Sequence, residues 1–345
     1  MKQLRRTLSL DDVLLEPQYS NVRSRLDTDL RTKVTKNYEL RVPIMSTNMS
    51  TVTEYDMMMV MNSIGGVGAL HRFMQPYKSL QMIERASAAK LYPIIASIGV
   101  GPSEVIRARE LRKKGANIIL IDVAHGHSVQ VMETYTAIRE QNSDTDIIVG
   151  NIASKKAAVD FLALGVDGLR VGIGGGSRCL TRTVTGHGVP NLTALMDAVE
   201  ARNKHYDNTG HYVPVIIDGG IKTSGDMTKA LYFGADVVCI GNLLAGTEET
   251  PGEKITRDGK HFKKYFGMAS KDAMDLHGKG KQGIAAEGFS ELVPYKGSAK
   301  NILEELVGGI RSGLTYSGAM NISDLRKKGV PLLLSDAARY ESKMR

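Results

Sequence analysis

Cysteine is scarce in this chain of 345 residues, and we expect no secretory leader. The two cysteines, Cys179 and Cys239, form no CxxC motif and are too few to build a disulfide framework. The chain begins with charged residues, but the apolar stretch of a leader does not follow them. We therefore expect a cytoplasmic protein in a reducing environment, where a free reactive thiol can persist.

Long apolar runs and dense runs of charge are also absent. No segment approaches the roughly 20 apolar residues of a membrane span, so we expect no membrane partner. Lys and Arg number 45 against 37 Asp and Glu, which gives a formal net charge of +8. Because the basic residues are spread out, without an aromatic-interleaved stripe, we expect no nucleic-acid partner and favour small anionic ligands such as nucleotides.

Short apolar runs recur along the chain, and most are separated by amphipathic helical patterns. Continuous apolar strands that alternate with helices predict a parallel sheet covered by helices. Eight such runs suggest a closed (β/α)8 TIM barrel that forms a single catalytic domain over residues 1–345. A doubly wound open sheet is the alternative, because a count of strands does not prove closure. The predicted strands are 42–45, 66–70, 92–98, 117–123, 146–149, 168–172, 213–218 and 236–240, and predicted helices include 103–114, 154–164 and 223–233.

Two connections are longer than the others. Residues 174–191, after the sixth strand, carry Cys179 and several glycines and are interpreted as a mobile catalytic loop. Residues 247–300, after the eighth strand, include a Gly/Lys-rich stretch at 277–283 and are interpreted as a flap rather than a second domain. In a barrel, both connections leave from the carboxyl ends of strands and lie on the same face.

Two motifs at strand ends point to chemistry. Gly-Ile-Gly-Gly-Gly-Ser-Arg-Cys at 172–179 lets the backbone turn tightly, presents bare N–H and C=O groups and delivers one thiol at the end of the turn. Ile-Ile-Asp-Gly-Gly at 216–220 ends a strand with a carboxylate and lets a ligand approach the main chain. Together the motifs supply a nucleophile and a phosphate cradle.

With Pro-Ile-Met-Ser-Thr-Asn-Met at 43–49 and Tyr-Phe-Gly-Met at 265–268, these motifs give the chain a resemblance to the IMP dehydrogenase/GMP reductase family, nearly from end to end. The resemblance implies a TIM barrel, usually a homotetramer, that binds a purine nucleoside monophosphate (GMP or IMP) and a nicotinamide cofactor. It also implies covalent catalysis, in which Cys179 attacks purine C2 and water or hydride resolves the adduct.

The resemblance also implies the binding residues. Phosphate would be held by Ser177 and by the glycine turns, the ribose by Asp218, and the base would be framed by methionines. The residues implied to bind substrate are Met49, Ser177, Asp218, Gly219, Gly220, Gly241, Asn242, Tyr265, Gly267, Met268 and Ala269. The cofactor would lie against Arg72, Asp122, Ala124 and His125, and backbone carbonyls of Gly174, Gly176 and Cys179 would hold a monovalent cation, K+.

The two reactions of the family differ in what resolves the covalent adduct. Dehydrogenases carry an Arg-Tyr pair on the flap to activate water, whereas residues 270–288 here contain neither residue type. Reductases use a Thr and a Glu to protonate the departing amine, and Thr181 and Glu287 occupy those positions. The short connection 70–94 leaves no room for the regulatory CBS pair that is usual in dehydrogenases. We therefore predict a GMP reductase that uses NADPH.

Several alternatives remain open. An IMP dehydrogenase that uses NAD, an enzyme for a variant purine nucleotide and a non-catalytic nucleotide sensor would all preserve much of this pattern. Three residues depart from it: Gly175 replaces a common proline, Arg178 either activates the neighbouring thiol electrostatically or faces solvent, and Ile284 stands where some reductases have an arginine. Cys239, within an apolar strand, is interpreted as core packing, and the two histidines at 125 and 127 are weak evidence for a metal site.

Overall fold

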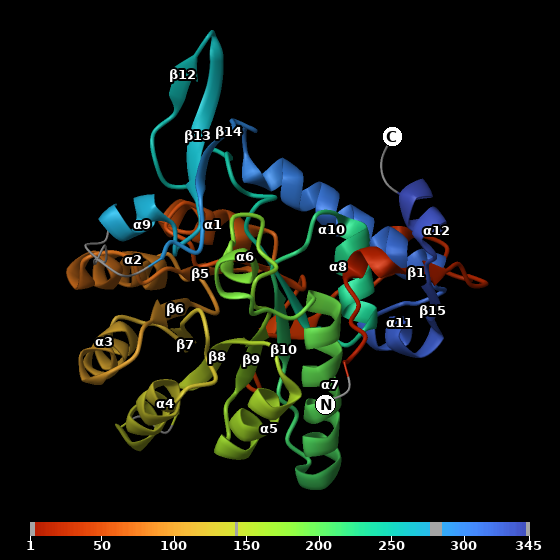
Figure 1. The fold of residues 1–345 in the computed structure, drawn as a ribbon, viewed down its shortest axis with the longest axis horizontal. Helices are drawn as coiled ribbons and strands as arrows, with labels where there is room; N and C mark the ends of the chain where they lie inside the picture. The colour runs from red at the N-terminus through yellow and green to blue at the C-terminus, as the bar shows by residue number, and fades with distance from the viewer. Residues whose placement is uncertain (1–3, 142–143, 277–284, 343–345) are drawn as a thin grey trace.

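Eight parallel strands close into a barrel, which confirms the predicted TIM barrel and excludes the open sheet (Figure 1). The structure is a computed structural model that describes residues 4–141, 144–276 and 285–342. The hydrogen-bonded order around the barrel is β10-β11-β4-β5-β6-β7-β8-β9. The barrel strands are β4 (Ile44–Ser46), β5 (Val67–Leu70), β6 (Ile95–Ile98), β7 (Ile118–Asp122), β8 (Asp146–Ile152), β9 (Gly168–Val171), β10 (Val215–Asp218) and β11 (Val237–Ile240).

The barrel strands are apolar on both faces because both faces are covered. One set of side chains, which includes Met45, Ile118 and Ile216, fills the interior of the barrel. The other set, which includes Ile119 and Ile217, packs outward against the helices. Burial on both sides explains why the strands read as continuous apolar runs instead of alternating ones.

Helices surround the barrel and follow the strands in sequence (Figure 1). The start of α8 is set by a capping box, in which Asp226 N donates to Thr223 Oγ1 over 3.1 Å. The end of α5 is set by Gly165, whose φ of 88° suits a residue without a side chain. The helices are α1 (Tyr55–Ser63), α2 (Pro76–Ala88), α3 (Pro102–Lys113), α4 (Val129–Gln141), α5 (Lys155–Leu164), α6 (Thr181–Thr185), α7 (Asn191–Thr209), α8 (Ser224–Tyr232), α9 (Lys271–Leu276), α10 (Ala299–Tyr316), α11 (Ile322–Lys328) and α12 (Asp336–Glu341).

Short antiparallel elements lie outside the barrel. The hairpin of β2 (Thr32–Lys33) and β3 (Glu39–Leu40) contributes Val34 and Leu40 to the cluster that fills the barrel. Near the two ends of the chain, β1 (Val13–Glu16) pairs with β15 (Val330–Leu333). Across the described ranges, none of the helices combines the length and the apolar character needed to cross a bilayer.

The long connection after β11 contains regular structure of its own. It forms a three-stranded antiparallel sheet of β12 (Ile255–Arg257), β13 (Lys260–Phe266) and β14 (Ser290–Pro294), and the β12–β13 hairpin projects away from the barrel in Figure 1. The prediction of a flap is refined accordingly: Tyr265 lies on β13 of this sheet, and β14 begins three residues after Glu287. The Gly/Lys-rich stretch and Ile284 lie outside the described residues.

Candidate active site

The three residues predicted to carry the chemistry, Cys179, Thr181 and Glu287, form a hydrogen-bonded chain with Thr181 in the middle. The free thiol of Cys179 is half-buried, two residues before the start of α6. It donates to Thr181 Oγ1 over 3.2 Å, and the Thr181 hydroxyl donates to Glu287 Oε2 over 2.7 Å. A thiol, a hydroxyl and a carboxylate therefore form one path along which a proton can move.

Main-chain contacts hold Glu287 beside the nucleophile loop. Leu180 N donates to Glu287 O over 2.6 Å, and Glu287 N donates to Ala269 O over 2.9 Å. Gly288, the next residue, forms an isolated antiparallel bridge with Cys179. The turn after β13 that was predicted to bind substrate is thereby brought next to the thiol; its residues are Gly267, Met268 and Ala269.

The two glycine motifs approach each other so closely that side chains would not fit between them. Gly172 has a φ of 138°, and a Cβ there would lie 2.1 Å from the Asp218 carbonyl oxygen. A Cβ on Gly219, whose φ is 83°, would lie 3.0 Å from Gly176 N. Glycine is needed at both positions for its backbone conformation and for its lack of volume. The predicted nucleophile turn and the predicted phosphate turn thus form one site.

Asn191, at the start of α7, holds these turns together and was not identified from the sequence. Its Nδ2 donates to the main-chain oxygens of Asp218, over 3.1 Å, and of Gly219. A Cβ on Gly175 would lie 2.3 Å from Asn191 Oδ1. Proline also carries a Cβ, so Asn191 gives a physical reason for glycine at 175 where the family pattern has proline.

Several residues predicted to bind nucleotide surround the Tyr265 hydroxyl. Tyr265 Oη lies 3.9 Å from Met49 Sδ, and a Cβ on Gly241 would lie 3.4 Å from the same hydroxyl. Burial raises the pKa of Tyr265, and a side-chain hydrogen bond with Ser177 opposes that shift. The neighbouring Asn242 is exposed, and its carbonyl oxygen accepts from Lys296 Nζ over 3.2 Å. These contacts bring strands β4, β11 and β13 to the nucleophile loop.

A buried arginine, also missed from the sequence, connects the two carboxylates at the carboxyl ends of β7 and β10. Arg170 on β9 has a side chain 4% exposed, and its guanidinium lies 3.0 Å from both Asp122 and Asp218. It also donates to Asn48 Oδ1 over 2.7 Å. Burial disfavours the charged form of Arg170. Electrostatic interactions with Asp218, Cys239 and Asp122 are stronger than this effect and raise the pKa of Arg170. The sequence does contain a signal for this residue, because Arg170 is a charged residue inside the predicted apolar strand 168–172.

Asp218 is further fixed by Asn151, whose Nδ2 donates to Asp218 Oδ2 over 2.7 Å and also to Gly172 O. The Asp218 side chain keeps 19% of its surface exposed, as a ligand-binding carboxylate requires. Arg170 and Asn151 therefore orient it without burying it.

The residues predicted to bind cofactor gather around the end of β7. Asp122 is 17% exposed, and Ala124 and His125 are exposed on the loop that follows it. Arg72, predicted to meet a cofactor phosphate, is turned toward Asp122, because its Nε donates to Asp122 O over 3.0 Å and lies 3.5 Å from the carboxylate. In this arrangement Arg72 helps to hold Asp122 in position.

The histidine pair at 125 and 127 does not belong to a cluster of metal-binding side chains in the part of the chain that the structure describes. His127 of the 125/127 pair bonds to Asp160 over 2.8 Å. Within residues 4–141, 144–276 and 285–342, no group of three His, Cys, Asp or Glu side chains is arranged to hold a metal ion. The Gly176 carbonyl accepts from Cys179 N over 3.1 Å. A K+ site formed by the carbonyls of Gly174, Gly176 and Cys179 stays a prediction.

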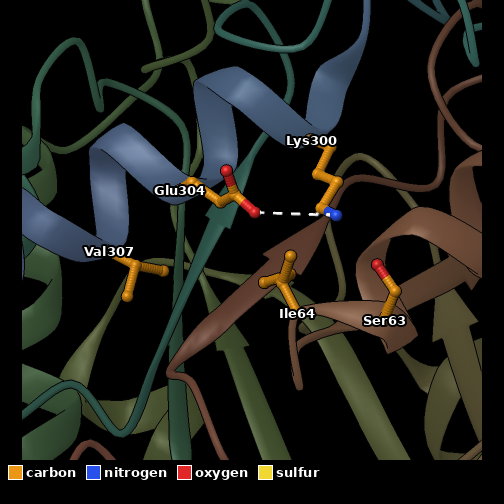
Figure 2. Close-up of a pocket in the computed structure, with 5 residues that line it drawn as sticks. All are labelled: Ser63, Ile64, Lys300, Glu304 and Val307. Atoms are coloured by element: carbon orange, nitrogen blue, oxygen red, sulfur yellow. Dashed lines mark ion pairs between the residues drawn. The ribbon is translucent and has the colours of Figure 1, made fainter.

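Two other features lie apart from this site. Cys239 is fully buried, and burial, reinforced by the Asp218 carboxylate, raises the pKa of its thiol, which agrees with core packing. A surface cavity of about 350 Å³ lies between the end of α1 and α10 (Figure 2). Its lining residues include Ile64 and the ion pair of Lys300 and Glu304, 3.8 Å apart, and none of the predicted site residues.

Comparisons with known proteins agree with this geometry. An inosine-5'-monophosphate dehydrogenase from Borreliella burgdorferi is 35% identical over 399 residues, which cover 99% of this chain and 97% of the relative. A GMP reductase from Leishmania donovani is 29% identical over 477 residues, which cover 97% and 96%. Both alignments are longer than the 345 residues of this chain, so both relatives contain segments without a counterpart here.

Among solved structures, the fold matches a GMP reductase variant from Trypanosoma brucei in complex with guanosine 5'-monophosphate. The TM-score is 0.90 at 27% sequence identity, with 99% of this chain and 98% of that chain covered. The family described as "IMP dehydrogenase / GMP reductase domain" matches residues 7–345. This protein therefore belongs to the IMP dehydrogenase/GMP reductase family of oxidoreductases.

Proposed function

We propose that this protein is a GMP reductase, which converts GMP to IMP and ammonia with NADPH as the reductant. The observation that carries the proposal is the hydrogen-bonded path from Cys179 through Thr181 to Glu287. A reductase must protonate a departing amine, because amide ion is a very poor leaving group. A carboxyl group that reaches the nucleophile through one hydroxyl is suited to this task.

The same path can take the proton from the Cys179 thiol and deliver it to the departing amine. Thr181 accepts from the Cys179 thiol while donating to Glu287, so the thiol proton can pass to the carboxylate as sulfur attacks C2 of GMP. The protonated Glu287 then passes this proton through Thr181 to the 2-amino group, the C2–N bond breaks with release of ammonia, and C2 remains bonded to sulfur. After reduction at C2 the C2–S bond breaks, and its electron pair returns to sulfur as the thiolate.

Nicotinamide supplies the hydride that reduces C2. The residues at the end of β7 fit such a cofactor, because the partly exposed Asp122 carboxylate can accept from ribose hydroxyls. Arg170 and Arg72 fix that carboxylate, and Ala124 and His125 leave the neighbouring loop open to a ligand. Asp218 can accept from the ribose of the nucleotide in the same way, and Arg170 connects the two carboxylates.

The flap segment supports reduction over hydrolysis. Residues 270–288 contain no Arg and no Tyr, so a water molecule at the adduct would lack the pair that activates it in dehydrogenases. The match to a GMP reductase solved with guanosine 5'-monophosphate supports the same substrate. An NAD-dependent IMP dehydrogenase is the second candidate, because the dehydrogenase relative is 35% identical and the reductase relative 29%. A homotetramer, K+ and a cytoplasmic location remain predictions.

Replacing the two relay residues tests the proposal. We expect Thr181→Val and Glu287→Gln each to lower kcat for NADPH oxidation with GMP by about 10² to 10⁴, with KM for GMP changed by less than about threefold. Thr183→Val, an exposed position on α6, is the matched control and should keep normal kcat. Ammonia should be released in equal amounts with NADPH consumed. Full activity of Glu287→Gln would contradict the proposed acid.

A further inference from the structure

Arg178, the residue before the candidate nucleophile, contacts the sheet that follows the barrel. Its Nη2 lies 2.7 Å from Glu291 Oε2 on β14, and its side chain is 15% exposed. Its Cζ lies 5.2 Å from the ring centroid of Tyr265 and 5.0 Å from that of Phe289. The interpretation in which Arg178 faces solvent is therefore wrong, because the guanidinium lies among an acid and two aromatic rings.

The main chains of the two segments meet at the same place, but over a short distance. Phe289 N donates to Arg178 O over 3.3 Å, and Leu180 N donates to Glu287 O. A Cβ on Gly288 would come within 2.9 Å of Arg178 O, so the approach depends on glycine. The side chain of Arg178 adds two contacts between the same segments, an ion pair with Glu291 and a cation–π contact with the Phe289 ring.

Arginine suits this position better than other residues. Its planar guanidinium can contact aromatic faces while it donates to a carboxylate, which a lysine ammonium cannot do in the same geometry. The arginine side chain is 15% exposed and the Glu291 side chain 53% exposed, so salt screens only part of this ion pair. Residues 287–291 carry both Glu291, the acid partner of Arg178, and the candidate catalytic acid Glu287. The ion pair of Arg178 with Glu291 therefore restricts the movement of Glu287 as well.

We propose that Arg178 is a positioning residue that fastens residues 287–291 to the nucleophile loop and thereby keeps Glu287 bonded to Thr181. Arg178 acts through Glu287 and does not touch the reacting atoms. The catalytic consequence rests on the proposed function, whereas the fastening itself holds for any reaction at Cys179.

Hydrogen exchange tests the fastening without turnover. In Arg178→Met, which keeps the length of the side chain and removes its charge, amides of Leu180 and Phe289 should exchange at least about tenfold faster than in the wild type. Glu291→Gln should show the same acceleration, and Arg178→Lys a smaller one. Lys114→Met breaks the exposed pair of Lys114 with Glu84, 2.8 Å apart, and should leave these amides unchanged. Unchanged exchange in Arg178→Met and Glu291→Gln would overturn the proposal.

Kinetics test the catalytic consequence. Arg178→Met should lower kcat about tenfold while KM for GMP changes less than about threefold. In the Glu287→Gln background the same substitution should cost little more, because the acid to be positioned is gone. A raised KM with normal kcat would instead assign Arg178 to substrate binding and overturn the positioning role. An inactive wild type would defeat the proposed function, and the exchange result would still decide the fastening.

Discussion

Replacing Arg170 by methionine removes a cation that two carboxylates share. Arg170 lies 3.0 Å from both Asp122 and Asp218, and its side chain is 4% exposed. Removal of one partner from a buried pair costs about 3 to 5 kcal/mol, because the remaining charge is left without compensation. Since the two carboxylates are 17% and 19% exposed and keep some water, we take the lower end, about 3 kcal/mol.

Urea unfolding measures this loss directly. The midpoint for Arg170→Met should fall with little change in the slope, and the difference should correspond to about 3 kcal/mol of unfolding free energy. Lys114→Met is the control, because its exposed pair with Glu84 is worth about 0.2 to 1 kcal/mol. A loss in Arg170→Met no larger than that of the control would refute the reasoning.

The same variant should affect binding in a recognisable way. If Asp122 holds the cofactor and Asp218 the nucleotide, loss of Arg170 should raise KM for both ligands, since both carboxylates lose their orientation. A rise for one ligand alone would show that the arginine does not connect the two subsites.

Two further predictions concern backbone geometry and pH. Gly172→Ala should lower the free energy of unfolding by about 3 kcal/mol, because its Cβ would lie 2.1 Å from Asp218 O at a φ of 138°. The control is Gly186→Ala, which has a φ of 71° and no neighbouring atom within 4 Å of the added Cβ and should cost about 1 kcal/mol. Equal losses of unfolding free energy in the two variants, measured by urea unfolding, would contradict the packing argument. Burial, together with the Asp236 carboxylate, raises the pKa of Tyr212 to about 12. The unfolded chain releases the Tyr212 proton first, near pH 10, so the stabilisation is complete below pH 10 and is lost as pH rises toward 12. Across that window the free energy of unfolding should fall by about 2 to 3 kcal/mol more in the wild type than in Tyr212→Phe. Equal decreases in the two proteins would contradict this prediction.

Much of the barrel could be predicted because its strands are buried on both faces. A run such as Ile118–Asp122 has no polar face to disguise it, and capping residues such as Thr223 mark where the helices begin. The strand pair β1–β15 left no such signal. All four residues of β15 are exposed, so its pairing depends on where the fold brings the chain ends.

The residues of the candidate site also fall into two groups, those that the sequence identifies and those that only the folded structure reveals. The nucleophile and the glycine turns are local motifs, and Thr181 and Glu287 were found by resemblance. Arg170 and Asn191 gain their roles from partners distant in sequence: Arg170 donates to Asn48, 122 residues away, and Asn191 to Gly219, 28 residues away. No local pattern states such a partnership, although a charged residue inside an apolar strand indicates that some partner must exist.

The most direct test of the proposed reaction compares two pairs of substrates. Purified protein is mixed with GMP and NADPH, and separately with IMP and NAD, while the absorbance of the reduced nicotinamide is followed. We predict loss of absorbance in the first mixture, no change in the second, and no change in either with Cys179→Ala. A gain of absorbance with IMP and NAD, together with no loss with GMP and NADPH, would contradict the account and make the protein a dehydrogenase.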